Sequence, residues 1–202
     1  EAKTGYGLTD DSELMLLQDL LMLDKKGPVE IAPTYLGAHA IAPEYRDNPQ
    51  GYTDEVTNTM LPMVKDWWGT HAPHHALPFV DVFCENKAFT LAQSRQILTS
   101  AGSLGFPLKI HADEFDNLGG ASLAAELGAV SADHLVKTSD ADIAAHAIGA
   151  YGSRITYARR LATGQRKQIW VAEFGSLVQD LISDDREGAI ANYERSLQLN
   201  PE

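Results

Sequence analysis

Short β-prone runs alternate with stretches of helical spacing over the first 150 residues, and this alternation limits the fold more than any other feature of the sequence. The run at 79–84, FVDVFC, is compact and apolar, as expected for a strand of a buried parallel sheet. Apolar residues at helical spacing precede it at 53–68 and follow it at 90–104. We therefore predict an α/β fold in which helices pack on a parallel sheet.

The same pattern predicts the remaining elements, and the composition of the chain changes near residue 150. Further strands are expected at 29–36, 108–110 and 129–133, and further helices at 10–26, 121–127 and 140–148. Asp10 or Asp11 is available as the N-cap of the first helix, and Gly27-Pro28 ends it. We predict two domains, an α/β domain over 1–150 and a helical tail over 151–202.

Charge and cysteine content argue against several classes of function. The chain has 16 Lys and Arg against 28 Asp and Glu, a formal net charge of −12, so neither nucleic acid nor an anionic membrane is expected as a partner. No run approaches the ~20 apolar residues of a membrane span. The single cysteine, Cys84, rules out an internal disulfide and fits a reducing, cytoplasmic location. The chain starts at Glu1 without a leader sequence, so no signal peptide is expected.

Reactive side chains gather at the carboxyl ends of four expected strands. These ends read KTGYG at 3–7, GAHA at 37–40, HADE at 111–114 and SADH at 131–134. Residues just past the carboxyl ends of parallel strands converge on one face, where ligands bind. Three histidines at equivalent junctions, together with Glu114, fit a metal-assisted hydrolase in which a His binds the ion and a carboxylate moves protons. A single His at such a place is more often a structural hydrogen-bond partner, so the prediction depends on the repetition.

Other residues that could carry chemistry have simpler interpretations. His71, His74 and His75 lie in a Pro-flanked loop without a fixed scaffold, and we interpret them as solvated rather than metal-binding. Cys84 ends an apolar run and is interpreted as a small buried hydrophobe. Gly119-Gly120 precedes a helix, where glycines allow either a close approach to an anion or tight packing, and the sequence leaves both open.

Four segments resemble the imidazolonepropionase family in their order and amino-acid sequence. They are KTGYGL at 3–8, YLGAHAIAPEY at 35–45, VDVFCENKAF at 80–89 and LKIHADEFDNLGGASLAAELGAVSADHL at 108–135. That family comprises metal-dependent amidohydrolases of histidine degradation, and the resemblance covers about residues 1–145. It implies a partial TIM-type (β/α) barrel. It also implies a hydrolase that uses zinc or iron to open the ring of a small-molecule substrate, 4-imidazolone-5-propanoate, giving N-formimidoyl-L-glutamate.

The resemblance also implies a role for each matched residue. His111 resembles the metal ligand on the fifth strand of the family's barrel. Glu114 resembles the group that relays a proton between the metal-bound water and the substrate, and His134 the catalytic histidine beside the attacking hydroxide. Tyr6 and His39 resemble residues that contact the substrate.

Departures from the family pattern imply an incomplete ligand set in this chain. The family's first strand supplies a His-x-His pair and its eighth an Asp, but no His-x-His occurs in the 202 residues, and the pattern is lost after about residue 145. A mononuclear site needs three or four ligands, and His111 is one. Two alternatives therefore stay open: another cyclic amidohydrolase, and a non-catalytic fragment or fusion with a helical interaction module.

The tail carries a second resemblance. Residues 185–201, DREGAIANYERSLQLNP, are similar to the second helix of a tetratricopeptide repeat, and a plain amphipathic helix is the alternative. A partial barrel leaves two strands at open edges, so a homo-oligomer, a partner segment or a longer chain is expected to cover them.

Overall fold

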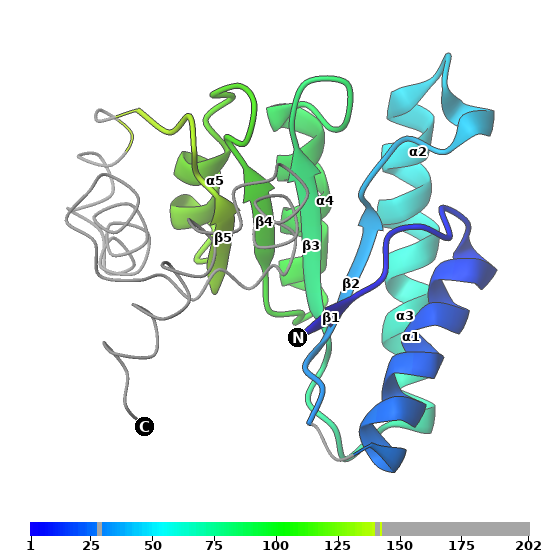
Figure 1. The fold of residues 1–202 in the computed structure, drawn as a ribbon. Helices are drawn as coiled ribbons and strands as arrows, with labels where there is room; N and C mark the ends of the chain where they lie inside the picture. The colour runs from blue at the N-terminus through cyan, green and yellow to red at the C-terminus, as the bar shows by residue number, and fades with distance from the viewer. Residues whose placement is uncertain (28–29, 140–141, 143–202) are drawn as a thin grey trace, which may run out of the picture.

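The computed structural model describes residues 1–27, 30–139 and 142, which form a parallel sheet flanked by helices (Figure 1). The described strands are β1 (Ala2–Lys3), β2 (Pro33–Ala38), β3 (Phe79–Cys84), β4 (Lys109–Ala112) and β5 (Ser131–His134), and they lie side by side in sequence order. The α-helices are α1 (Asp10–Lys26), α2 (Pro49–Glu55), α3 (Leu61–His71), α4 (Leu91–Ser103) and α5 (Gly120–Glu126). A 3-10 turn, η1 (Pro43–Tyr45), precedes α2, and a π-helical turn, η2 (Val56–Met60), joins α2 to α3.

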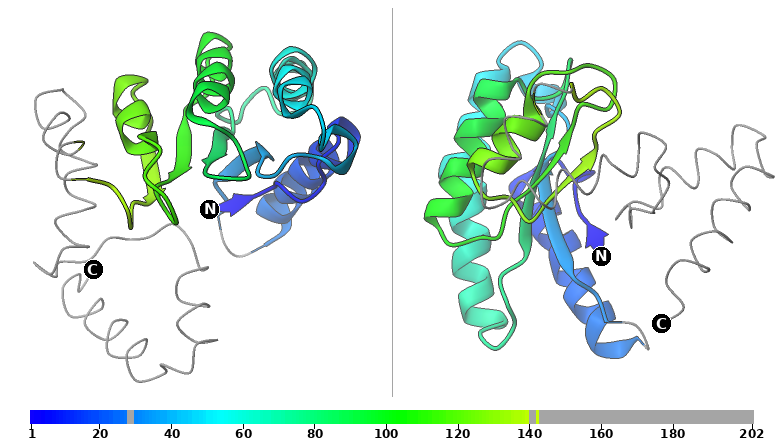
Figure 2. Two further views of the ribbon diagram at one scale, coloured as in Figure 1. Left: turned by 90° about the horizontal axis from the view of Figure 1, so that it is seen from above. Right: turned by 90° about the vertical axis from the view of Figure 1, so that its left-hand side faces the viewer.

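The sheet is curled, and its helices lie on the outer side. Seen from above, the strands follow an arc with the helices arranged around it (Figure 2). All four strand pairs are parallel, so each strand connects to the next through a helical crossover. The predicted α/β fold is therefore confirmed, and the described part has the curvature of a partial TIM-type barrel.

Strand alternation divides the side chains between a hydrophobic layer and a polar inner layer. On β3, Val80, Val82 and Cys84 belong to the core between sheet and helices, while Asp81 and Phe83 alternate with them and face the other way. Cys84 is fully buried, which confirms its interpretation as a small hydrophobe. The core is closed by apolar residues of the helices, among them Leu17, Val64, Ile97, Leu98 and Leu123.

Gly120 is required by close packing at the start of α5. A Cβ on Gly120 would lie 2.6 Å from Cβ of Ala112 and 3.3 Å from Sγ of Cys84. Helix α5 therefore rests on β4 at a distance that only glycine permits. Of the two interpretations of Gly119-Gly120, the structure favours packing.

Element boundaries differ from the predicted ones where backbone pairing or capping overrides local preference. The N-cap of α1 is Thr9, whose side chain accepts from the amide of Ser12, so the prediction of Asp10 or Asp11 was wrong by one or two residues. The helix expected at 53–68 runs from 49 to 71, because Asn48 caps it and a π-helical turn continues it. Strand β2 extends past Gly37, since Ala38 still pairs with Val82.

Several predictions fall on residues outside the described part. These are the helix at 140–148 apart from Asp142, the tetratricopeptide-like helix at 185–201, and the division into domains at 150. They stay predictions. No helix in the described part of the chain has the length and hydropathy of a membrane span.

Candidate active site

The rings of the predicted site residues form a continuous line of contacts along the carboxyl ends of the strands. Tyr6, in the loop after β1, meets the ring of His39, after β2, edge to face at 4.9 Å between centroids. His39 lies 5.9 Å from Phe83 on β3, and Phe83 lies 6.2 Å from His111 on β4. The His111 ring is 5.3 Å from that of His134, at the end of β5. The fold therefore brings the four residues together, with Phe83 as a link that the sequence did not single out.

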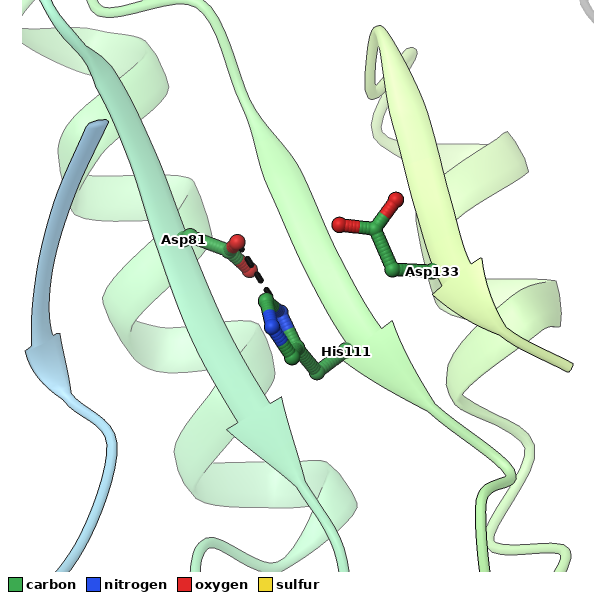
Figure 3. A group of neighbouring side chains, drawn as sticks. All are labelled: Asp81, His111 and Asp133. Carbon is green, nitrogen blue, oxygen red and sulfur yellow. Dashed lines mark ion pairs between the residues drawn. The ribbon is translucent and has the colours of Figure 1, made fainter. Parts of the chain in front are cut away.

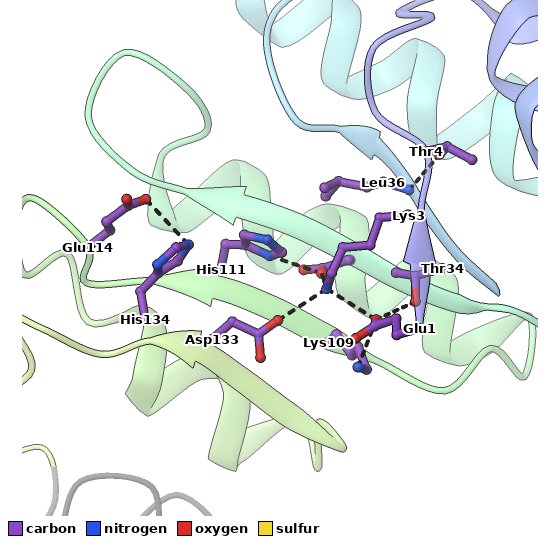
Figure 4. A network of polar contacts seen from close by, with 11 residues as sticks. Glu1, Lys3, Thr4, Thr34, Leu36, Lys109, His111, Glu114, Asp133 and His134 are labelled. Carbon is purple, nitrogen blue, oxygen red and sulfur yellow. Dashed lines mark hydrogen bonds and ion pairs between the residues drawn. The ribbon is translucent and has the colours of Figure 1, made fainter. Parts of the chain in front are cut away.

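Glu114 joins this line through His134. Its Oε2 atom lies 3.4 Å from Nε2 of His134 (Figure 4), and both side chains are partly exposed. His134 has a φ of 70°, in the left-handed region, which costs a non-glycine residue ~1–3 kcal/mol. Such strain persists only where the surroundings hold the residue in place. The carboxylate and the imidazole are close enough to exchange a proton with a common ligand.

A second group, Asp81, His111 and Asp133, lies on adjacent strands in the inner layer. One ligand atom from each lies within 4.8 Å of the others, and all three residues are buried (Figure 3). His111 and Asp133 are register partners across β4 and β5. The Nδ1 atom of His111 is 2.9 Å from Oδ2 of Asp81. These nitrogen and oxygen donors are of the types that bind zinc or iron.

The Lys3 ammonium bridges the two aspartates of this group, and Figure 4 shows its contact with Asp133. Its Nζ atom is 2.8 Å from Oδ2 of Asp81 and 3.1 Å from Oδ2 of Asp133. Burial alone would raise the pKa of the Asp81 carboxyl, but the His111 ring and the Lys3 ammonium outweigh it and lower that pKa to about 2. Burial would likewise lower the pKa of Lys3, but Asp81 and Asp133 raise it well above its usual range. The two aspartates therefore stabilise a positive charge between them.

The polar layer continues along the inside of the sheet. Oε1 of Glu1 lies 3.1 Å from Nζ of Lys3 and 2.8 Å from Nζ of Lys109, and Thr34 donates its hydroxyl to the same carboxylate oxygen. Residues of β1 to β5, with Glu1 just before β1, thereby enter one network of charges and hydrogen bonds. The network fixes the inner face on which the Asp-His-Asp group lies.

Two buried acids brace the loop that carries Glu114. Glu85, just after β3, accepts hydrogen bonds from the amides of Asn86 and Phe115, and the Phe115 amide immediately follows Glu114. Asp113 accepts from the Thr138 hydroxyl at 2.6 Å, and burial raises the pKa of the Asp113 carboxyl although that hydrogen bond lowers it. Glu114 therefore lies between two backbone positions that are each held by a carboxylate.

Sequence reasoning missed Asp81, Asp133, Lys3 and the buried acids. A signal for Asp81 is present, because a carboxylate inside FVDVFC must face away from the apolar helix layer. Lys109 in LKIHA carries the same signal. The partner of each charge could not be inferred, since it depends on the register between strands.

The histidines of the Pro-flanked loop lie apart from this site. His71 ends α3 and stacks on Trp67, with its ring centroid 4.7 Å from the Trp67 ring, and it is exposed like His74 and His75. Within the residues that the structure describes, none of the three joins a metal-ligand group. The exposure of the three side chains agrees with their interpretation as solvated residues.

Several curated proteins similar to this chain are imidazolonepropionases. Imidazolonepropionase from Herpetosiphon aurantiacus is 50% identical over 144 residues, which cover 71% of this chain and 34% of that protein. The chain is homologous to imidazolonepropionases. The enzyme from Chloroflexus aggregans is 50% identical over 137 residues, 67% of this chain and 32% of its own length. The one from Fusobacterium nucleatum is 49% identical over 143 residues, 71% of this chain and 33% of its own length.

The similarity to imidazolonepropionases confirms the resemblance stated from the sequence and covers only part of each protein. The chain spans about a third of the length of these curated relatives. No protein-family model matches the chain.

Proposed function

We propose that this chain is an imidazolonepropionase-like amidohydrolase, which opens the ring of 4-imidazolone-5-propanoate to N-formimidoyl-L-glutamate. The observation that carries the proposal is the juxtaposition of Glu114, His134 and His111 at the carboxyl ends of adjacent strands, beside Tyr6 and His39. The 50% identity with an imidazolonepropionase over 144 residues supports the choice of substrate.

The reaction breaks the ring C–N bond of a cyclic amide and forms a C–O bond with water. Glu114 takes a proton from the attacking water and delivers it to the leaving nitrogen, which a carboxylate that both accepts and returns a proton can do. His134, 3.4 Å from Glu114, donates to the developing oxyanion. Tyr6 and His39 enclose the substrate ring with their edge-to-face pair.

The inner residues offer donors to a divalent cation, which would have to displace the Lys3 ammonium from between the two aspartates. His111 supplies an imidazole nitrogen, and Asp81 and Asp133 supply carboxylate oxygens that already hold the ammonium of Lys3. We propose zinc or iron as the ion, with His111 as its ligand and the two aspartates as the nearest further donors. When bound, the ion would act as a Lewis acid that polarises the carbonyl oxygen of the substrate.

Metal content tests the role of His111. We expect the wild-type chain to keep more zinc or iron after dialysis than His111→Ala, because loss of the imidazole leaves two carboxylates that already pair with Lys3. His71→Ala is the matched control, since His71 is exposed and stacked on Trp67, and it should keep the metal. Elemental analysis gives both values. Equal metal content in the two variants would remove His111 from the ligand set.

Substrate preference tests the reaction itself. We expect kcat/KM for 4-imidazolone-5-propanoate to exceed that for the same ring without the propanoate, and for propanoate rings with two carbonyl groups, by about 10-fold or more, because each lost polar contact costs ~1–3 kcal/mol. Following ring opening by ultraviolet absorbance gives the rates. A higher rate on a ring with two carbonyl groups would favour the alternative of another cyclic amidohydrolase.

Partners and location are the remaining proposals. We propose a small-molecule substrate and a cytoplasmic location, the latter from the single buried cysteine. In the described sheet β1 and β5 are the edge strands, and a homo-oligomer that covers these edges stays a prediction for light scattering.

A further inference from the structure

Glu13 is a buried carboxylate that the proposed reaction does not use. It lies in the first turn of α1, and none of its surface is exposed. Its carboxylate accepts hydrogen bonds from three backbone amides of the preceding loop, those of Gly5 at 2.9 Å, Gly7 at 2.6 Å and Leu8 at 3.0 Å. This loop is the dark blue segment between β1 and α1 in Figure 1. The side chain therefore points back into the loop, while Thr9 serves as the helix N-cap.

The loop is packed too closely to rearrange without cost. A Cβ on Gly5 would lie 2.9 Å from the carbonyl oxygen of Leu36 and 3.0 Å from Cβ of His39, and Gly5 has a φ of 117°. A Cβ on Gly7 would lie 2.9 Å from the amide nitrogen of Glu13. Hydrogen bonds to an ionised acceptor are about twice as strong as neutral ones. The three amides thus fix the path of the backbone on both sides of residue 6.

Tyr6 is the residue that this loop presents. Its side chain is 85% exposed, so little packing of its own holds it, but its ring meets His39 edge to face at 4.9 Å. Nδ1 of His39 lies 3.1 Å from the carbonyl oxygen of Gly5. Both rings of the proposed substrate-contacting pair are therefore located by the backbone that Glu13 holds.

We propose that Glu13 is a positioning residue, which sets the affinity for the substrate ring by fixing Tyr6 against His39. The inference rests on the proposed function for the identity of the ligand, but the contact between the two rings can be measured without it. Glu13 acts through the loop and touches no reacting atom.

The test is Glu13→Gln in the full chain, with two measurements. The amide keeps the shape of the carboxylate, but its NH2 group faces backbone donors, so the loop loses part of its anchoring. We expect the nuclear Overhauser contacts between the Tyr6 and His39 rings to disappear, and the Kd for imidazole-4-propanoate, a stable analogue of the substrate ring, to rise about tenfold. Glu44→Gln, at an exposed acid, is the control and should change neither measurement.

A double variant separates positioning from general destabilisation. If Glu13 acts through Tyr6, then Glu13→Gln in a Tyr6→Ala background should raise the Kd further by less than about threefold, because the two changes remove the same interaction. Fully additive effects, or ring contacts that persist in Glu13→Gln, would overturn the proposal. A wild-type chain that does not bind the analogue would count against the proposed function, and the ring contacts alone would then decide the role of Glu13. If the Gln variant is unfolded by circular dichroism, Glu13→Asp, which keeps the charge and shortens its reach, takes its place in both measurements.

Discussion

Glu114→Gln should lower kcat by about 100-fold or more, while the metal content of the chain stays that of the wild type, because proton transfer carries that much of the rate. The Gln amide has the shape of Glu114 and retains a contact with His134, but it can neither accept a proton from water nor return one to the leaving nitrogen. Turnover measured at saturating substrate, together with elemental analysis, tests both parts of the expectation.

Glu126→Gln is the matched control for this change. Glu126 is an exposed acid of α5 that pairs with Arg95 of α4 on the helical side of the sheet, and its variant should turn over like the wild type. Normal turnover in Glu114→Gln would show that the residue does not move the proton.

Lys3→Met should lower the free energy of unfolding by about 3–5 kcal/mol at pH 7, the usual cost of leaving buried charges without their partner. Lys3 lies within 3.1 Å of carboxylate oxygens on Glu1, Asp81 and Asp133, so its loss leaves three acids with less compensating charge. Arg95→Met removes a cation from an exposed pair with Glu126 and should leave the free energy of unfolding nearly unchanged. Urea denaturation of metal-free protein measures both.

The loss in free energy of unfolding caused by Lys3→Met should be smaller at low pH. In the wild type the pKa of folded Asp81 is about 2, below the ordinary 3.8, so ionised Asp81 contributes stability above pH 4 that is lost as the pH falls through about 2. Without the ammonium, ionised Asp81 has lost one of the two positive groups that lower its pKa, so its charge destabilises the fold. Protonation relieves this, so the difference from wild type should be smaller at pH 4.5 than at pH 7. A difference that is constant with pH would contradict this account of Lys3.

The fold could be predicted where local residues mark the ends of a helix or strand. α1 ends before Gly27 and β3 fills the apolar run 79–84, and both matched the prediction to the residue. Local sequence signals did not predict the boundary of an element where a strand or helix continues past a residue that usually ends it. Ala38 stays in β2 because it pairs with Val82 on a neighbouring strand. The π-helical turn η2 (Val56–Met60) could not be predicted, because its residues do not follow the 3.6-residue spacing of an α-helix.

The candidate site could be predicted only in its outer part. Glu114 and His134 were placed by their positions at strand ends, where the fold alone brings them to one edge. Asp133 escaped notice although it precedes His134, because its role comes from Lys3 on a strand 130 residues away. Long-range charge pairs of this kind depend on the curvature of the sheet, which no local pattern encodes.

The product formed in H2(18)O shows whether this chain hydrolyses the ring of 4-imidazolone-5-propanoate, as we propose. The metal-loaded chain is incubated with the substrate in labelled water, and the mass of the product is measured by mass spectrometry. We predict N-formimidoyl-L-glutamate that carries one labelled oxygen in its new carboxylate, formed by the wild type at a rate that Glu114→Gln reduces about 100-fold. Substrate recovered without ring opening, from a chain that holds its metal, would contradict the account.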